Sequence, residues 1–234
     1  MIENIVIVIF WFSISVIIYT YIGYPIILKL LSFFYNYETP SDPRKWPRLS
    51  LIISAFNEEE VITQKLSNSL SLDYPKDLLE IIVASDGSED NTDEIVNNYN
   101  NKGVILLRVE GRVGKTAVQN EAVTHATGDI IVFSDANALY DSDAIKKLVR
   151  HFKDESVGCV EGRRLDYVEN ETGATKHELT FHEYESKIKI LESQVLSCTG
   201  ATGPIYAVRR SNYIPLPSNT ISDLMEPIMI MHKY

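Results

Sequence analysis

The chain is poor in cysteine and in positive charge, and each shortage excludes a class of function. Only two of its 234 residues are cysteines, Cys159 and Cys198, and they form no C-x-x-C pair. A thiolate zinc site is therefore not expected, and the thiols should be reduced, as in the cytosol. Lysine and arginine number 22 against 32 acidic residues, which gives a net charge of −10. Such a chain lacks the basic stripe that a nucleic-acid partner requires, so no nucleic acid is expected.

A long stretch near the start of the chain contains no charged residue. No charged residue stands between Asn4 and Leu28, where Ile, Val, Phe, Trp and Tyr dominate. This stretch is long enough to cross a hydrocarbon core of about 30 Å. A cleavable signal peptide is the alternative, but Glu3 replaces the basic n-region and no small-residue cleavage pattern follows. We therefore predict one retained transmembrane helix within residues 1–35, which Pro25 should kink or end.

The charges that flank this stretch predict its orientation. Glu3 is the only charge before it, and four basic residues follow it: Lys29, Arg44, Lys45 and Arg48. Because positive residues stay on the cytoplasmic side, we predict a single-pass protein of the cell membrane whose remaining chain is cytoplasmic. Prolines in residues 36–48 predict a linker that cannot continue the helix, and the soluble domain should occupy residues 49–234.

Beyond the linker, apolar runs alternate with helical patterns. The runs cover residues 49–54, 80–84, 104–109 and 130–134, and helical patterns follow them at 58–70, 92–99, 115–125 and 142–152. Repeated strand-then-helix order predicts an α/β fold with a mainly parallel sheet flanked by helices. A strand over 158–167, a helix over 177–196 and a strand over 205–208 are expected after these elements.

Two of the apolar runs end in the same dipeptide, Ser85-Asp86 and Ser134-Asp135. Ligands of parallel sheets gather at the carboxyl ends of the strands, so each run should deliver a carboxylate to the ligand. A role in turns or helix capping would explain either aspartate alone. Asn137 stands two residues after Asp135, and together with substrate phosphates these oxygens suit one hard cation, Mg²⁺ or Mn²⁺.

Two further loops each have two interpretations, and the sequence does not decide between them. Asn57 could cap a helix whose first turn is acidic, or residues 54–58 could wall a base-and-ribose pocket. The loop Gly111–Thr116 opens a helix, but a Walker loop needs glycine where Val109 stands. Lys115 at this helix start can meet a diphosphate, or it can be a solvated lysine in a glycine turn.

Taken in order, six motifs resemble the family 2 glycosyltransferases with a GT-A fold. The motifs are Ile53–Glu58, Ser85–Ser88, Gly114–Lys115, Ser134–Asn137, Thr199–Gly203 and Ile221–Asp223. Tyr21–Pro25 and the tyrosine-rich helix near Tyr184 are similar to the membrane-bound branch that includes cellulose, chitin and hyaluronan synthases. That branch also has a Gln-x-x-Arg-Trp motif and C-terminal transmembrane helices, which this sequence does not contain. We therefore expect a C-terminally truncated domain or a partner subunit that supplies these elements, and no processive synthesis by this chain alone.

The resemblance implies a role for each motif. The residues that would bind a UDP-sugar are Ser54, Ala55, Phe56, Glu58, Asp86, Lys115 and Asp135. Asp135 and Asn137 would hold Mg²⁺ or Mn²⁺, and the acceptor-side loop would consist of Gly200, Ala201, Thr202 and Gly203. Asp223 matches the general base of inverting members, although Glu226 is also close in sequence. The acceptor would be a saccharide or a lipid-linked molecule.

Two other functions compete with this interpretation. A nucleotidyltransferase could use paired acids and a basic loop, but this class leaves the order of the other motifs unexplained. The non-enzyme alternative is a truncated or degenerate glycosyltransferase domain that binds nucleotide or a partner without turnover.

Overall fold

The computed structural model of the chain describes residues 2–35, 38–163 and 173–233. Its internal contacts separate two compact units. The helical unit contains residues 1–38 and 166–198, and the sheet unit contains residues 39–165 and 199–234. In this division residues 173–198 group with the N-terminal helix, and the predicted domain bounds 1–35, 36–48 and 49–234 stay a prediction.

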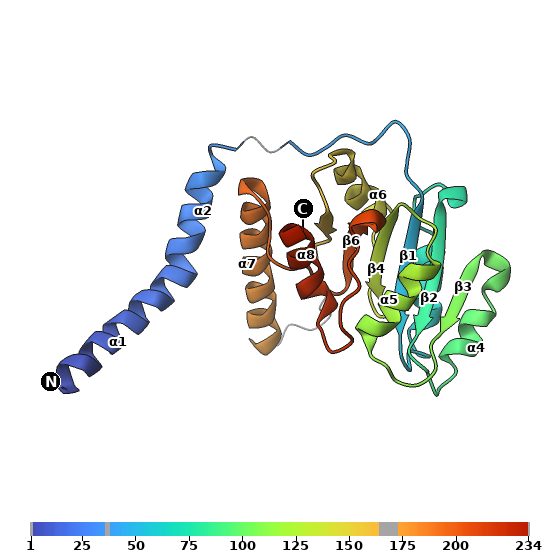
Figure 1. Cartoon of the computed structure of the whole chain (residues 1–234), viewed down its shortest axis with the longest axis horizontal. Helices are drawn as coiled ribbons and strands as arrows, with labels where there is room; N and C mark the ends of the chain where they lie inside the picture. Colours follow the sequence, from blue (N-terminus) through green and yellow to red (C-terminus); the bar gives the residue numbers. More distant parts are fainter. Residues whose placement is uncertain (1, 36–37, 164–172, 234) are drawn as a thin grey trace. The chain divides into compact units, whose positions relative to one another are not determined.

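The helical unit begins with one long apolar helix. Helix α1 (Ile2–Ile18) passes through a π-helical turn, η1 (Tyr19–Gly23), into α2 (Tyr24–Ser32), as Figure 1 shows. Pro25 lies in the first turn of α2, where a missing N–H costs little, so the helix continues beyond it. The helix spans 31 residues with a mean hydropathy of 2.4 in its most apolar window, long and apolar enough to cross a membrane.

Helix α7 (Gly173–Val195) covers most of the predicted helix 177–196 and contacts α2. The Tyr24 hydroxyl donates to Glu192 Oε1 at 2.6 Å. The Tyr184 hydroxyl donates to the backbone oxygen of Tyr21 at 2.7 Å, and the two rings stack. These contacts explain why the segment groups with the apolar helix.

The described residues of the sheet unit form six strands in the order β3-β2-β1-β4-β6-β5. The strands are β1 (Leu49–Ala55), β2 (Leu79–Ser85), β3 (Val104–Arg108), β4 (Ile130–Asp135), β5 (Cys159–Glu161) and β6 (Ile205–Arg209). Strands β1 to β4 are parallel, whereas β6 runs antiparallel to both β4 and β5. The mainly parallel sheet is confirmed. Part of the predicted strand 158–167, residues 164–167, lies outside the described residues.

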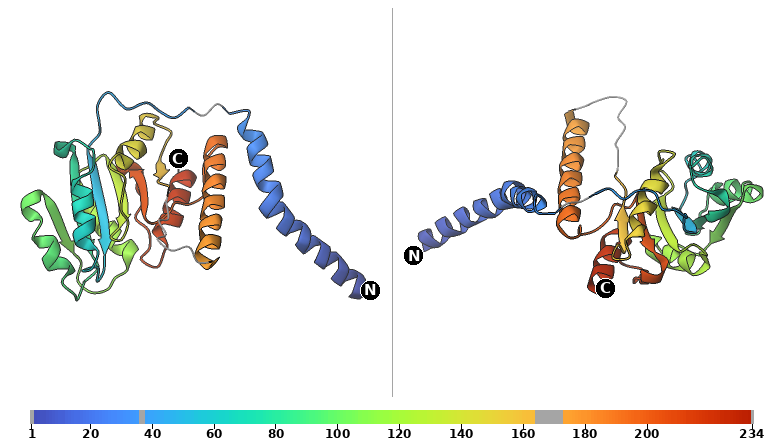
Figure 2. Two further views of the ribbon diagram at one scale, coloured as in Figure 1. Left: turned by 180° about the vertical axis from the view of Figure 1, so that it is seen from behind. Right: turned by 90° about the horizontal axis from the view of Figure 1, so that it is seen from above.

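Helices cover both faces of this sheet (Figure 2). The helices of the unit are α3 (Ile62–Leu70), α4 (Thr92–Asn97), α5 (Lys115–His125), α6 (Ala144–Val149) and α8 (Ser222–Lys233), with short 3₁₀ turns η2 (Lys76–Leu78), η3 (Asn100–Lys102), η4 (Arg150–Lys153) and η5 (Arg210–Asn212). Apolar residues of α3, α4 and α6 form one core with the sheet, and those of α5 and α8 form the other. Because side chains alternate along a strand, β1 contributes Leu51 to the first core and Ile52 to the second.

Two local expectations were wrong. Helix α3 begins at Ile62 rather than at Glu58, and Asn57 is not its N-cap. Asn57 adopts a left-handed backbone conformation (φ 54°), which asparagine tolerates better than most residues, and its side chain accepts the backbone N–H of Glu89. The residue joins two loops instead of starting a helix.

Candidate functional site

The loops after β1 and β2 are joined at the carboxyl edge of the sheet by side-chain to backbone hydrogen bonds. Asn57 N–H donates to Ser88 Oγ at 3.2 Å, and Glu58 N–H donates to Thr92 Oγ1 at 2.8 Å. In the other direction, Glu89 N–H donates to Asn57 Oδ1 at 2.8 Å. The Asn57 amide and the hydroxyls of Ser88 and Thr92 therefore fix one loop against the other.

Asp86 has a structural task that its position after β2 did not reveal. Its two carboxylate oxygens accept the backbone N–H groups of Val113 (2.8 Å) and Gly114 (3.0 Å), and the side chain is buried. Gly114 has a φ of 94°, a left-handed conformation that favours glycine, and Lys115 follows it as the first residue of α5. Asp86 thus positions the loop that delivers Lys115, and its contact with a nucleobase stays a prediction.

The other residues predicted for the donor pocket surround this edge. The Arg112 guanidinium lies 4.3 Å from the centre of the Phe56 ring, a cation–π contact. Ser54 accepts a hydrogen bond from Gln119, whereas Ala55 is buried in the core. Burial raises the pKa of Glu58, and the negative charges of Asp135 and Asp90 raise it further.

Three charged side chains meet at the buried glycine before β6. A Cβ placed on Gly203 would lie 2.8 Å from Asp223 Oδ2, 3.3 Å from Lys115 Nζ and 3.4 Å from Asp135 Oδ2. Lys115 Nζ also donates to Asp135 Oδ1 at 2.5 Å. These residues come from α8, α5 and β4, so the fold brings together groups that are far apart in sequence. Only glycine leaves the carboxylate of Asp223 room at this point.

The glycine turn 199–203 packs on the start of α8. Ala201 N–H donates to the backbone oxygen of Asp223 at 2.8 Å, and Thr202 Oγ1 donates to the backbone oxygen of Gly162 at 3.3 Å. Gly200 has a φ of 84°, and a Cβ there would lie 3.0 Å from Leu224 Cδ1. The predicted acceptor-side loop therefore lies against the helix that carries Asp223.

Asp223 and Glu226 occupy different environments, which the sequence could not distinguish. Asp223 lies in the first turn of α8, half-buried beside Lys115 and Asp135. Glu226 is only 1% exposed, and its Oε2 accepts the Tyr206 hydroxyl at 3.1 Å. Burial raises the pKa of Glu226 to about 8. Of these two acids, Asp223 is therefore the one that can contact a substrate at the carboxyl edge.

The oxygen donors at this edge suit a hard divalent cation. Within the described part of the chain, no group of three or more His, Cys, Asp and Glu side chains could hold a metal ion. Asp135 offers a carboxylate that is half-buried, and Asn137 is exposed in the turn that follows β4. Mg²⁺ and Mn²⁺ are commonly held by one or two protein oxygens together with substrate phosphates. The residues present fit such a shared site, in which the ligand supplies most of the oxygens.

A buried lysine beneath Asp135 was missed by sequence reasoning. Lys65 is fully buried; its Nζ donates to the Ala138 backbone oxygen at 2.6 Å and lies 3.7 Å from the centre of the Tyr140 ring. Burial lowers the pKa of Lys65 to about 7, although the charge of Asp135 opposes this shift. The Tyr140 hydroxyl donates to the backbone oxygen of Pro204, next to Gly203. The helical pattern contained a signal for it, because Lys65 stands three residues after Ile62 on the apolar face of α3.

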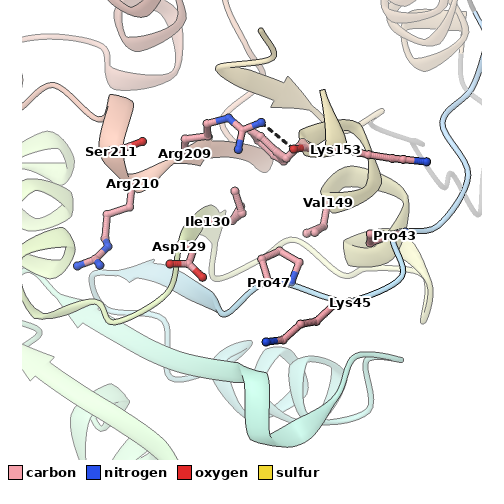
Figure 3. Close-up of a pocket in the computed structure, with 11 residues that line it drawn as sticks. Pro43, Lys45, Pro47, Asp129, Ile130, Val149, Lys153, Arg209, Arg210 and Ser211 are labelled. Atoms are coloured by element: carbon pink, nitrogen blue, oxygen red, sulfur yellow. Dashed lines mark hydrogen bonds between the residues drawn. The ribbon is translucent and has the colours of Figure 1, made fainter. Parts of the chain in front are cut away.

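A pocket of about 570 Å³ lies at the opposite edge of the sheet, where β4 begins at Ile130 (Figure 3). Its lining includes Asp129 and four cationic residues, which are Lys45, Lys153, Arg209 and Arg210. Arg209 donates to the backbone oxygens of Phe152 and Asp154 at 2.7 and 2.6 Å. Arg209 thus holds the turn after α6. None of the residues that line the pocket belongs to the six motifs.

Residues 50–213 match the family model of glycosyl transferase family 2, and the chain belongs to this family. Curated relatives include the probable glycosyltransferase YdaM of Bacillus subtilis, 37% identical over 126 residues. That alignment covers 51% of this chain and 30% of YdaM. The poly-beta-1,6-N-acetyl-D-glucosamine synthase of Staphylococcus aureus is 34% identical over 116 residues, which cover 49% of this chain and 28% of that protein. The matched part of the chain thus spans less than a third of these relatives.

Solved structures confirm the GT-A fold. The mannosyltransferase PcManGT from Pyrobaculum calidifontis, solved with GDP-Man and Mn²⁺, superposes with a TM-score of 0.72 at 24% identity, over 90% of this chain and 59% of that chain. TarS residues 1–349 of S. aureus give a TM-score of 0.58 at 20% identity, over 78% of this chain and 55% of that chain. At these identities the likeness establishes the architecture, and substrates require an argument of their own.

Proposed function

We propose that the chain is a membrane-anchored, metal-dependent, inverting glycosyltransferase that moves a sugar from a UDP-sugar to a saccharide or lipid-linked acceptor. The observation that carries this proposal is the meeting of Lys115, Asp135 and Asp223 around Gly203. A cation, a metal-binding carboxylate and a second carboxylate within one small region are the groups that such a transfer requires. Family membership supports the reaction class.

Each of these residues has a separate role in the proposed reaction. The Asp223 carboxylate takes the proton of the acceptor hydroxyl while the hydroxyl oxygen attacks the anomeric carbon of the donor sugar. The bond from that carbon to the UDP oxygen breaks in the same in-line step, which inverts the configuration. Lys115, at the N-terminus of α5, stabilises the negative charge that develops on the departing diphosphate. A divalent cation held by Asp135 and Asn137 would neutralise further charge on UDP when it is bound.

The membrane part of the proposal rests on the helix Ile2–Ser32. Its length and composition suit a span, and basic residues follow it. On this basis the sheet unit is assigned to the cytoplasmic side of the cell membrane. A partner subunit that completes the acceptor side is part of the same proposal.

The test is turnover by the purified full chain in detergent, with a panel of labelled UDP-sugars, a saccharide or lipid acceptor mixture and Mn²⁺. We expect UDP release from at least one donor. Asp223→Asn should lower release by at least about 100-fold while donor binding persists. Asp135→Ala should remove the metal-dependent part of donor binding. Full turnover by Asp223→Asn would contradict the assigned base, and unaltered metal-dependent binding by Asp135→Ala would contradict the metal site.

A further inference from the structure

One face of α5 holds the segment that leads to Asp223. Thr116 Oγ1 donates to the backbone oxygen of Thr220 at 2.6 Å, and Asn120 Nδ2 donates to that of Leu216 at 2.7 Å. Asn120 Oδ1 also accepts the hydroxyl of Tyr213 at 2.7 Å. Residues 116 and 120 are one helical turn apart, so both side chains face the same way. The chain before α8 is therefore fixed to α5 by side chains rather than by a strand.

Gln119 extends this face to α8 itself and connects it with β1. Its Nε2 donates to Ser54 Oγ at 3.3 Å, and its Oε1 accepts the Ser222 hydroxyl at 2.7 Å. Gln119 is 1% exposed and Ser222 6% exposed, so the hydrogen bond between them is buried, whereas the bond to the half-buried Ser54 is partly buried. Ser222 begins α8 and directly precedes Asp223. One buried amide thus joins the end of β1 to the helix turn that carries the proposed base.

We propose that Gln119 is a positioning residue for Asp223, which it fixes relative to the donor pocket through Ser222 and Ser54. This inference rests on the proposed function, because it presumes that Asp223 is the base and that Ser54 borders the donor. A shift of about 1 Å in a reacting group can cost about 100-fold in rate. The Ala201 N–H bond to the Asp223 backbone oxygen holds this turn from the side of the glycine loop, and the bond from Ser222 to Gln119 holds it from the side of α5. Of these two contacts, the Gln119 amide is the one that also reaches Ser54 at the end of β1.

The experiment compares Gln119→Met with Gln64→Met in the full chain. Gln64 is exposed on α3, so the same chemical change there serves as the control. For Gln119→Met we expect kcat for UDP release to fall about 10- to 100-fold. The KM for the donor should change less than twofold, because Lys115, Asp135 and Asp86 stay in place. Gln64→Met should keep both parameters. A raised donor KM with unchanged kcat, or no change at all, would overturn the positioning role.

A double-mutant cycle distinguishes positioning from general damage to the fold. Ser222→Ala removes only a hydroxyl, so it remains informative if Gln119→Met fails to fold. Because both substitutions remove one shared hydrogen bond, the double variant should lose little more rate than the worse single variant. Independent losses that multiply would contradict the proposal. In the Asp223→Asn background, Gln119→Met should not lower the residual rate, whereas a purely structural defect would.

The same measurements separate this inference from the proposed function. If the wild-type chain releases no UDP from any donor, or if Asp223→Asn turns over fully, the proposed function fails and this inference fails with it. If both of those results are as expected and Gln119→Met keeps the wild-type kcat, only the positioning role fails.

Discussion

The two edges of the sheet use their polar side chains differently. At the carboxyl edge, charged groups face one another around a single glycine, and hydrogen bonds between loops fix their positions. The amino edge has the pocket of about 570 Å³, lined by cations, where Arg209 is occupied with backbone oxygens. A cavity alone is therefore a poor guide to the site in this fold. Convergence of charged side chains from separate elements is the better guide.

The largest expected effect compares one aspartate from each edge. Asp223→Asn should lower kcat for UDP release by about 100- to 10,000-fold, since it removes the only proposed proton acceptor. Asp129→Asn, the matched change at the amino edge, should leave kcat within about twofold. The assay is UDP release by the full chain with Mn²⁺ at saturating donor. Equal losses in the two variants would mean that the carboxyl edge has no special role.

Next in size is the lysine that pairs with Asp135. Lys115→Gln removes the cation expected to face the diphosphate, and we predict a donor KM raised by roughly 10-fold or more. Lys153→Gln at the amino edge provides the control and should not change KM. Initial rates over a range of donor concentrations measure both. An unchanged KM in Lys115→Gln would show that this lysine serves only as the ion-pair partner of Asp135.

Gly203→Ala probes how tightly the carboxyl edge is packed. The added methyl group would lie 2.8 Å from Asp223 Oδ2, so the carboxylate must move. We expect kcat to fall about 10-fold while the thermal unfolding temperature stays close to that of the wild type. Turnover and circular dichroism melts of the same preparation separate the two effects. Wild-type kcat in this variant would show that Asp223 has free space, which contradicts the geometry of the site.

The smallest effect on turnover is expected for Glu226, which lies in the core below this edge. Its pKa is raised from 4.5 to about 8, so unfolding between these pH values releases a proton. Stability should consequently fall as the pH rises from about 4.5 to about 8. Glu226→Gln removes this ionisation, and at pH 8.5 it should melt at least about 3 °C above the wild type, with little difference at pH 5. Parallel pH dependences of the two melting temperatures would refute the buried carboxyl assignment.

Local patterns predicted much of the sheet unit. Apolar runs predicted the parallel strands, and a helical pattern predicted the bounds of α5 (Lys115–His125). Both kinds of pattern depend only on residues that are close together in the sequence. The two Ser-Asp strand ends also lie at the carboxyl edge, as a parallel sheet requires. Their tasks differ, since Asp86 holds the 111–114 loop and Asp135 faces Lys115.

Other features depend on contacts between segments that are distant in the sequence, and no pattern of neighbouring residues predicts them. An apolar run does not indicate direction, so the antiparallel course of β6 could not be predicted. Helix α8 and the choice between Asp223 and Glu226 depend on which face of α8 meets the second core. The bond from Gln119 to Ser222 joins residues 103 positions apart. No spacing rule links such a pair.

The most direct test of the central claim is calorimetric titration of UDP with Mn²⁺ into the detergent-solubilised full chain and two variants. One variant, Asp135→Ala, alters the carboxyl edge, and the other, Lys45→Gln with Arg210→Gln, alters the pocket at the amino edge. The account predicts that UDP binding weakens by at least about 10-fold in Asp135→Ala and stays unchanged in the pocket variant. Loss of binding in the pocket variant, with wild-type affinity in Asp135→Ala, would contradict it.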